Sequence, residues 1–134
     1  MSRLSAFLNP KASDLEKEVY LSDRFVDDKG KPVPVKIRAL LQEESEQLRK
    51  SSTHTVTING ETAEKFDVDE YNHKLVLKAV VDPDLSSEEA CKHCGVLDPT
   101  MVPGRTFLAG EFTKLVKAIS DLSGFGDVKA DAKN

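Results

Sequence analysis

Hydrophobic and polar side chains alternate along two stretches in the first third of the chain. Residues 16–21 and 33–37 each place apolar side chains at every second position, which is the pattern of a half-buried strand. Gly30 lies in the turn-forming segment between them and is suited to a positive φ angle. We therefore predict a β-hairpin over 16–38. Two prolines at the start of its second strand predict an edge position, because proline cannot donate a hydrogen bond to a neighbouring strand: Pro32 and Pro34.

A second hairpin is predicted around Asn59 and Gly60. This dipeptide is the strongest two-residue hairpin signal, since both positions accept positive φ angles. The flanking segments 54–58 and 61–65 become its strands. They are short and polar, so we expect the hairpin to project from the body while extending the sheet made by the first hairpin.

Apolar residues at helical spacing predict two main helices. One is capped by Asp67 or Asp69 and runs to about Val81, with a broad apolar face. The other covers 111–123, where Gly124 provides a C-terminal stop. Its apolar stripe is the clearest in the chain: Phe112, Leu115, Val116, Ile119 and Leu122.

Shorter elements fill the remaining segments. We predict a helix over 42–50 with Leu41 and Leu48 on its buried side, and a brief helix that begins at Ser86 or Ser87 and runs towards His93. Segment 98–110 is expected to be irregular, because its Pro-Gly pair breaks helices.

Together these elements predict an α+β fold, in which a small antiparallel sheet built from hairpins packs against two main amphipathic helices. The length of 134 residues suits one domain, 1–134, with a core over about 14–125. Residues 126–134 have almost nothing to bury and are predicted to be a disordered tail.

Composition narrows the class of protein. The formal net charge is −4, and basic residues are scattered among carboxylates, which argues against nucleic-acid binding. No stretch approaches the ~18–20 apolar residues of a membrane span. The N-terminal segment is too polar for a signal peptide. We expect a cytoplasmic protein without a membrane association.

The paired cysteines are the main candidate for a metal site. Cys91 and Cys94 have zinc-ligand spacing and His93 lies between them, which gives the alternative function of a small zinc-binding regulatory or adaptor module. A structural zinc site needs four protein ligands, and the sequence shows no second pair. The favoured interpretation is two semi-buried free thiols with no metal and no cofactor.

The sequence offers no catalytic arrangement, so we predict that the protein is not an enzyme. The carboxylate clusters lie in turns and first helical turns, where they favour the helix dipole. His73 has no Ser or Cys placed beside it and is expected to be a partly exposed surface residue. A Gly-x-Ser-x-Gly elbow and a phosphate loop are both missing.

Two apolar segments lack obvious internal partners and are therefore the candidates for protein binding. One is N-terminal and the other lies in the segment expected to be irregular. The candidate partner-binding residues are Leu4, Phe7, Leu8, Met101, Val102, Phe107 and Leu108.

Several short motifs, taken in order, resemble the XkdN-like tail assembly chaperones of phages and prophages of Gram-positive bacteria. The resemblance covers roughly 14–126. It departs from the family pattern at 101–106 and at Ala109, where the family tends to have proline. The motifs are Arg24-Phe25, the run Gly30 to Arg38, Glu43-Glu44 with Leu48-Arg49-Lys50, Phe66-Asp67, Tyr71, Lys74-Leu75-Val76, Pro83-Asp84-Leu85, Gly110-Glu111-Phe112, Leu115, Ile119 and Gly124-Phe125.

The resemblance implies a small non-enzymatic protein that coats the long, largely helical tape measure protein and keeps it soluble. Such chaperones give way as tail tube subunits polymerise around the tape measure, so each contact should be weak and avidity should come from many copies. The tail tube protein and weak self-association are further partner hypotheses. The resemblance supplies no catalytic or binding residues.

Overall fold

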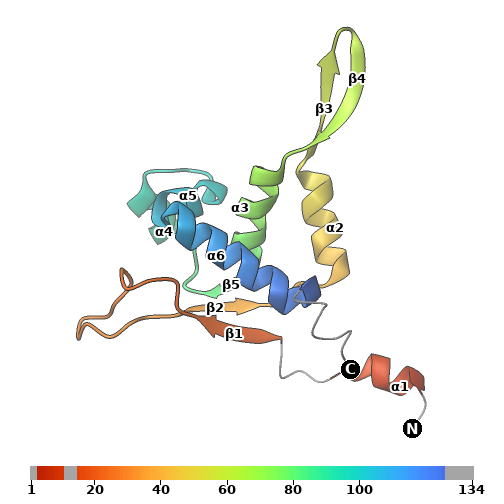
Figure 1. The fold of residues 1–134 in the computed structure, drawn as a ribbon. Coiled ribbons are helices and arrows are strands. Elements are labelled where there is room, and N and C mark those ends of the chain that lie inside the picture. Colours follow the sequence, from red (N-terminus) through yellow and green to blue (C-terminus); the bar gives the residue numbers. More distant parts are fainter. Residues whose placement is uncertain (1–2, 11–14, 126–134) are drawn as a thin grey trace.

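The structure is a computed structural model that describes residues 3–10 and 15–125. Figure 1 shows a helical layer over a small sheet, with one hairpin that stands away from both. In chain order the elements are α1 (Arg3–Leu8), β1 (Glu16–Val19), β2 (Val35–Arg38), α2 (Gln42–Ser51), β3 (Thr53–Ile58), β4 (Glu61–Phe66), α3 (Val68–Ala79), β5 (Val80–Asp82), α4 (Glu88–Cys94), a 3₁₀ turn (Pro99–Met101), α5 (Val102–Thr106), α6 (Ala109–Ser120) and a wide helical turn (Asp121–Phe125).

The main sheet has the antiparallel order β1-β2-β5, so β2 is its central strand. The predicted pairing of the first hairpin is confirmed, with Val19 opposite Val35, and Gly30 has the expected positive φ of 78°. The edge position predicted for its second strand is wrong. Both prolines precede Val35, so every residue of β2 keeps its N–H for the ladders on its two sides.

The third strand, β5, was assigned by sequence to the end of the helix 67–81. The helix ends at Ala79, and Val80 pairs with Ile37 of β2. β-Branched residues such as Val80 favour extended backbone, and pairing with the sheet decides the outcome. A three-residue strand directly after a helix carries no periodicity by which sequence could separate it.

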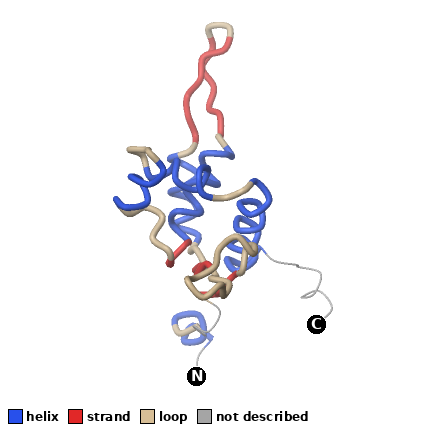
Figure 2. Tube along the Cα trace, turned by 90° about the vertical axis from the view of Figure 1, so that its left-hand side faces the viewer, coloured by secondary structure: helices blue, strands red, loops and turns tan. Residues whose placement is uncertain are grey.

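The second hairpin forms as predicted, with Asn59 at φ 53° and Gly60 at φ 82°. It does not extend the main sheet, contrary to the prediction. β3 and β4 make a separate two-stranded sheet that projects beyond α2 and α3 (Figures 1 and 2). Its strands contact chiefly each other, and every residue of β4 is exposed.

The core lies between the sheet and the helices α3 and α6. Ile37 of β2, Val76 of α3 and Ile119 of α6 are completely buried, and the buried apolar side chains of the described residues form one cluster. The two main helices are thus confirmed, as is the α+β class. Leu48 is buried as predicted, whereas Leu41 is 67% exposed because it precedes α2 in extended backbone.

The segment expected to be irregular, 98–110, contains the 3₁₀ turn and α5. Pro103 lies in the first turn of α5, where the missing N–H costs nothing. Gly104 is the next residue, and a Cβ there would approach Cε1 of His73 to 3.2 Å. The Pro-Gly pair therefore fits a short helix packed closely on α3. The predicted tail 126–134 lies outside the described residues.

Candidate functional site

The N-terminal candidate residues all lie on α1 and face solvent. The exposed fractions of Leu4, Phe7 and Leu8 are 65%, 78% and 68%, and no residue of α1 is buried. α1 is far from α5 in Figure 1, so the two candidate segments do not form one surface.

The second candidate segment is divided between surface and core. Met101 and Leu108 are 47% and 57% exposed, respectively, which keeps them available to a partner. Val102 is 1% exposed and belongs to the core. Phe107 is half-buried against Phe25, with 5.8 Å between ring centroids. Val102 and Phe107 thus have internal partners that sequence did not reveal, because α5 was not expected.

The paired cysteines do not gather metal ligands. Cys91 is buried and Cys94 is half-buried, with its Sγ 3.7 Å from Oγ1 of Thr106. His93 is exposed. Across 3–10 and 15–125, no group of three His, Cys, Asp or Glu side chains is close enough to hold a metal. The alternative zinc module therefore lacks its ligand set in the described part of the chain.

His73 is packed rather than poised for proton transfer. Its Nδ1 is 3.1 Å from the carbonyl of Thr100, and its ring lies 4.9 Å from the ring of Phe112. The prediction of a partly exposed histidine fits this half-buried position. Its remaining edge borders a shallow hollow of about 390 Å³ beside α3.

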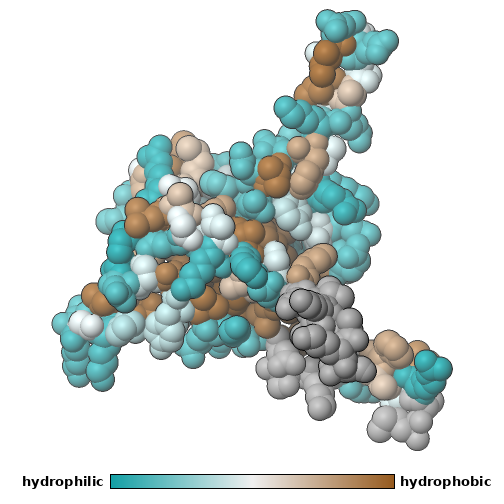
Figure 3. Space-filling view, in the orientation of Figure 1, coloured by the Kyte–Doolittle hydropathy of each residue, from teal (hydrophilic) through white to brown (hydrophobic). Residues whose placement is uncertain are grey.

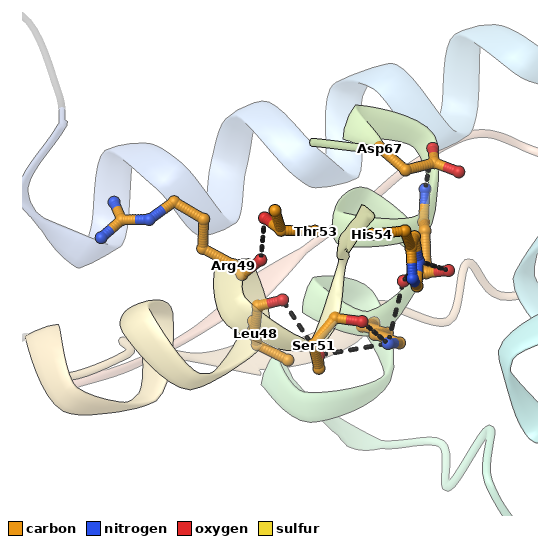
Figure 4. A network of polar contacts seen from close by, with 8 residues as sticks. Leu48, Arg49, Ser51, Thr53, His54 and Asp67 are labelled. Atoms are coloured by element: carbon orange, nitrogen blue, oxygen red, sulfur yellow. Dashed lines mark hydrogen bonds and ion pairs between the residues drawn. The ribbon is translucent and has the colours of Figure 1, made fainter. Parts of the chain in front are cut away.

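A polar network fixes the hairpin β3–β4 to the body at its base (Figure 4). Glu70 of α3 accepts from Nε2 of His54 at 3.0 Å and from Nζ of Lys74 at 3.1 Å. Lys74 also donates to the carbonyl and hydroxyl oxygens of Ser51, at 3.0 and 3.1 Å. The hydrogen bond from His54, followed by that from Lys74, lowers the pKa of Glu70.

Backbone bonds close the same base. The N–H of Asp67 donates to the carbonyl of Ser52 at 2.8 Å, where the chain enters and leaves the hairpin. Thr53 donates from its hydroxyl to the carbonyl of Arg49 at 2.8 Å. Asp67 also caps α3 by accepting from the N–H of Glu70 at 3.0 Å. These bonds orient the hairpin although it buries little apolar surface.

One face of the hairpin has apolar residues in its outer half. Directly paired residues share a face in an antiparallel ladder, so Val56 and Ile58 lie with Ala63 on one side, together with the polar residues His54, Glu61 and Lys65. Thr57 and Thr62 lie on the other side. Ile58 is 60% exposed. Sequence predicted the hairpin but missed this surface, although the alternation of Val56 and Ile58 before the Asn-Gly turn was the available signal.

Two arginine–carboxylate pairs join separate segments of the body, 87 residues apart in one pair and 6 in the other. Arg24 holds Glu111 of α6 at 2.7 Å, and Ser22 also donates to that carboxylate. Arg38 of β2 holds Glu44 of α2 at 2.7 Å. Each glutamate also accepts from the backbone N–H at the start of its own helix. The hydrogen bond from the arginine is the largest cause that lowers the pKa of Glu111 and of Glu44 to about 2.

Comparison with known proteins gives the family. The model of the phage XkdN-like tail assembly chaperone proteins matches residues 4–133. The chain belongs to the XkdN-like phage tail assembly chaperones. Its relatives include the phage-like element PBSX protein XkdN of Bacillus subtilis (strain 168), which is 26% identical over 98% of this chain and 93% of that protein.

A second relative of this XkdN-like chaperone, the B. subtilis (strain 168) protein YqbN, is 26% identical over 92% of this chain and 85% of that protein. The crystal structure of the protein YqbN has the same fold, with a TM-score of 0.75, 24% identity, and coverage of 93% of this chain and 98% of that chain. The family is one of phage assembly chaperones, not of enzymes.

The residues behind the sequence resemblance now have physical roles in this XkdN-like chaperone. Arg24 and Glu111 form one of the two arginine–carboxylate pairs, and Arg38 and Glu44 form the other. The first pair joins the segment between β1 and β2 to α6, and the second joins β2 to α2. These residues of the resemblance therefore stabilise the fold. No helix of residues 3–10 or 15–125 is long and apolar enough to cross a membrane.

Proposed function

We propose that this chain binds the tape measure protein of its own phage or prophage and keeps it soluble until tail tube subunits enclose it. Membership of the tail assembly chaperones supports a partner among tail proteins. The observation that carries the proposal is the hairpin β3–β4, which projects from the body, exposes Ile58 near its tip and makes few contacts with the rest of the chain.

The physical logic is that of a shared apolar surface. A long helix with an apolar stripe aggregates unless that stripe is covered. Exposed apolar side chains on α1, on β3 and at Met101 can cover such a stripe, and no chemical step is needed. Each copy contributes a small contact, so affinity along the rod comes from the number of copies. Weak single contacts also let tube subunits displace the chaperone, which acts in the bacterial cytoplasm.

Co-expression with the tape measure protein from the same gene cluster tests this function. We expect the tape measure to move from the insoluble to the soluble fraction and to elute with the chaperone in size-exclusion chromatography. A matched culture that expresses an unrelated soluble protein of similar size in place of the chaperone controls for overproduction. An insoluble tape measure and no shared elution peak would contradict the proposal.

A further inference from the structure

Among the described strands, β3 is the one sheet edge that has no protection against pairing with another strand. Edge strands are usually kept unpaired by charged side chains, by short length or by proline. Three of the four residues of β1 are charged, as are three of the six residues of β4. β5 has three residues and is followed by Pro83. β3 has six residues, none of which is Asp, Glu, Lys, Arg, Pro or Gly.

The unpaired backbone groups of this edge belong to Thr55 and Thr57. Both turn residues of the hairpin have positive φ angles, as in a type I′ turn, in which the carbonyl of Ile58 accepts from the N–H of Glu61. Hydrogen-bonded and non-hydrogen-bonded pairs alternate along an antiparallel ladder. Val56 therefore bonds to β4, whereas Thr55 and Thr57 direct their N–H and C=O groups away from it.

The ribbon is an incomplete sheet that is open to a further strand. It contains β3 and β4 alone, and a two-stranded ribbon without a third strand or a covering helix is only marginally stable. It stands clear of the helices in Figures 1 and 2, so a strand can reach its edge. In Figure 3 hydrophobic residues lie among hydrophilic ones along the projecting hairpin.

We propose that β3 pairs antiparallel with β3 of a second copy of this chain, which gives a four-stranded sheet across a two-fold axis. Val56 lies opposite Val56 of the second copy, and Thr55 lies opposite Thr57. This register keeps the Val56 side of both ribbons on one face of the joined sheet, because side chains alternate between faces. Opposed Thr pairs and opposed β-branched apolar pairs both stabilise antiparallel strands.

Charge favours a second copy as the occupant of this edge. β3 has no Asp, Glu, Lys or Arg, so two copies of it meet without the like-charge contacts that destabilise opposed strands. In the proposed register His54 lies opposite Ile58, and the two histidines do not face each other. The same edge pairing through β4 would bring together strands that each carry Glu61 and Glu64.

The dimer goes beyond the proposed function and does not depend on it. Edge pairing uses backbone groups, so both faces of the ribbon stay available to another protein. The two-fold contact closes on itself and stops at two copies. A few paired residues bury less area than a standard protein interface, so the association is weak and reversible. It strengthens where copies are held close together, as on one shared partner.

The edge is tested by T57P, with T62P as the matched control. Thr57 and Thr62 are paired across the ribbon, and each directs its N–H away from the other strand. Both prolines therefore remove an outward N–H and leave the β3–β4 bonds in place. Sedimentation equilibrium at several concentrations should show that T57P raises the Kd of the dimer about tenfold or more, and that T62P leaves it unchanged. Circular dichroism checks that both variants fold.

The register is tested by a cross-link that does not require proline. V56C places two thiols in a non-hydrogen-bonded pair, where a Cα–Cα distance of about 4.5 Å permits a disulfide. A63C puts a thiol on the same face, at the β4 residue paired with Val56. Both variants keep Cys91 and Cys94. With oxidised glutathione as the oxidant, V56C should form a covalent dimer on non-reducing gels and A63C should not.

The outcomes separate this dimer from the proposed function. An unchanged chain that sediments as a monomer at every soluble concentration overturns the dimer, and so does T57P that associates as T62P does. If A63C cross-links as readily as V56C, the β3 edge is overturned. If the chain alone stays monomeric and T57P weakens only its complex with the tape measure protein, the edge takes a strand of that protein and the second copy is overturned. None of these results removes the tape measure proposal, which co-expression tests.

Discussion

At the scale of single residues, two glutamates stabilise the arrangement of elements in the body. Glu44 and Glu111 each accept hydrogen bonds from an arginine on another segment and from the backbone N–H of the residue that precedes the helix. Glu111 is 6% exposed. A carboxylate held by a guanidinium and a backbone N–H is strongly favoured in its charged form. Stability should therefore depend on that charge.

The pKa values give the sign of this dependence. Both glutamates ordinarily titrate at 4.5 and are lowered to about 2 in the folded chain. Between these values the unfolded state binds more protons, so the free energy of unfolding falls as pH falls from about 4.5 to about 2. Above that range the contribution of these two groups is constant. Urea denaturation at several pH values measures the free energy of unfolding.

E111Q should flatten part of this pH dependence. The exposed Glu88, which pairs with Lys92, provides the control E88Q. Its carboxylate lies in solvent, so the pH profile of E88Q should match that of the unchanged chain. Equal profiles for E111Q and E88Q would contradict the assigned role of Glu111.

The core residues predicted from helical spacing allow a second test. Ile119 is completely buried, so I119A should lower the free energy of unfolding by about 2–5 kcal/mol, measured by urea denaturation. The exposed Leu97 provides the control L97A, which should stay within about 0.5 kcal/mol. A small effect of I119A would mean that the α6 stripe is not packed as described.

Residue-level prediction from sequence succeeded where one periodic element decides burial. Leu115 and Ile119 follow a helical stripe and are buried as expected. Leu41 and Val102 were misplaced because spacing applies only inside an element. Leu41 lies just before α2, and Val102 begins a five-residue helix that has no repeating pattern of its own.

At the scale of elements, local turn chemistry was enough to predict both hairpins but not how they are arranged. Asn59 and Gly60 determine the turn of β3–β4, yet nothing in that dipeptide says whether the ribbon joins β1 and β2. That depends on α2 and α3, which place the ribbon beyond the body. β5 was missed for the same reason, since its pairing with β2 is non-local.

Excision of the hairpin tests whether it is a recognition element. Replacing 54–65 by an Asn-Gly turn keeps the bonded base at Ser52 and Asp67. The free energy of unfolding should change by less than about 1 kcal/mol, because the main loss is the exposed His54–Glu70 pair. Circular dichroism measures this, and co-purification measures tape measure binding, which should be lost.

The matched control for the excision keeps both strands and carries T57S on the polar face of the ribbon. It should fold and bind like the unchanged chain. A body that melts without a cooperative transition after excision would show that the hairpin is part of the core, contrary to its exposed surface.

At the scale of the whole molecule, two parts that extend from the body expose apolar side chains, in addition to those exposed on the body itself. The hairpin lies at one end, and α1 lies at the other in Figure 1. The body between them holds the buried core. Sequence supplied the α+β class and the family, but the relative position of these two surfaces follows from packing among elements far apart in the chain.

The triple variant L4S/F7S/L8S tests the contribution of α1 as a second contact. Since α1 buries none of its residues, the thermal midpoint should move by less than about 2 °C. Tape measure binding, or the association between copies seen by sedimentation, should weaken. L97S provides an exposed control, and an unchanged complex and unchanged sedimentation for the triple variant would remove α1 from the partner surface.

The closed base of the hairpin has an evolutionary consequence. Because Ser52 and Asp67 are already bonded across it, changes in the length or outward residues of the ribbon leave the bonded base of the body intact. Under the proposed function, chaperones that serve different tape measure proteins could share one body and differ in the ribbon.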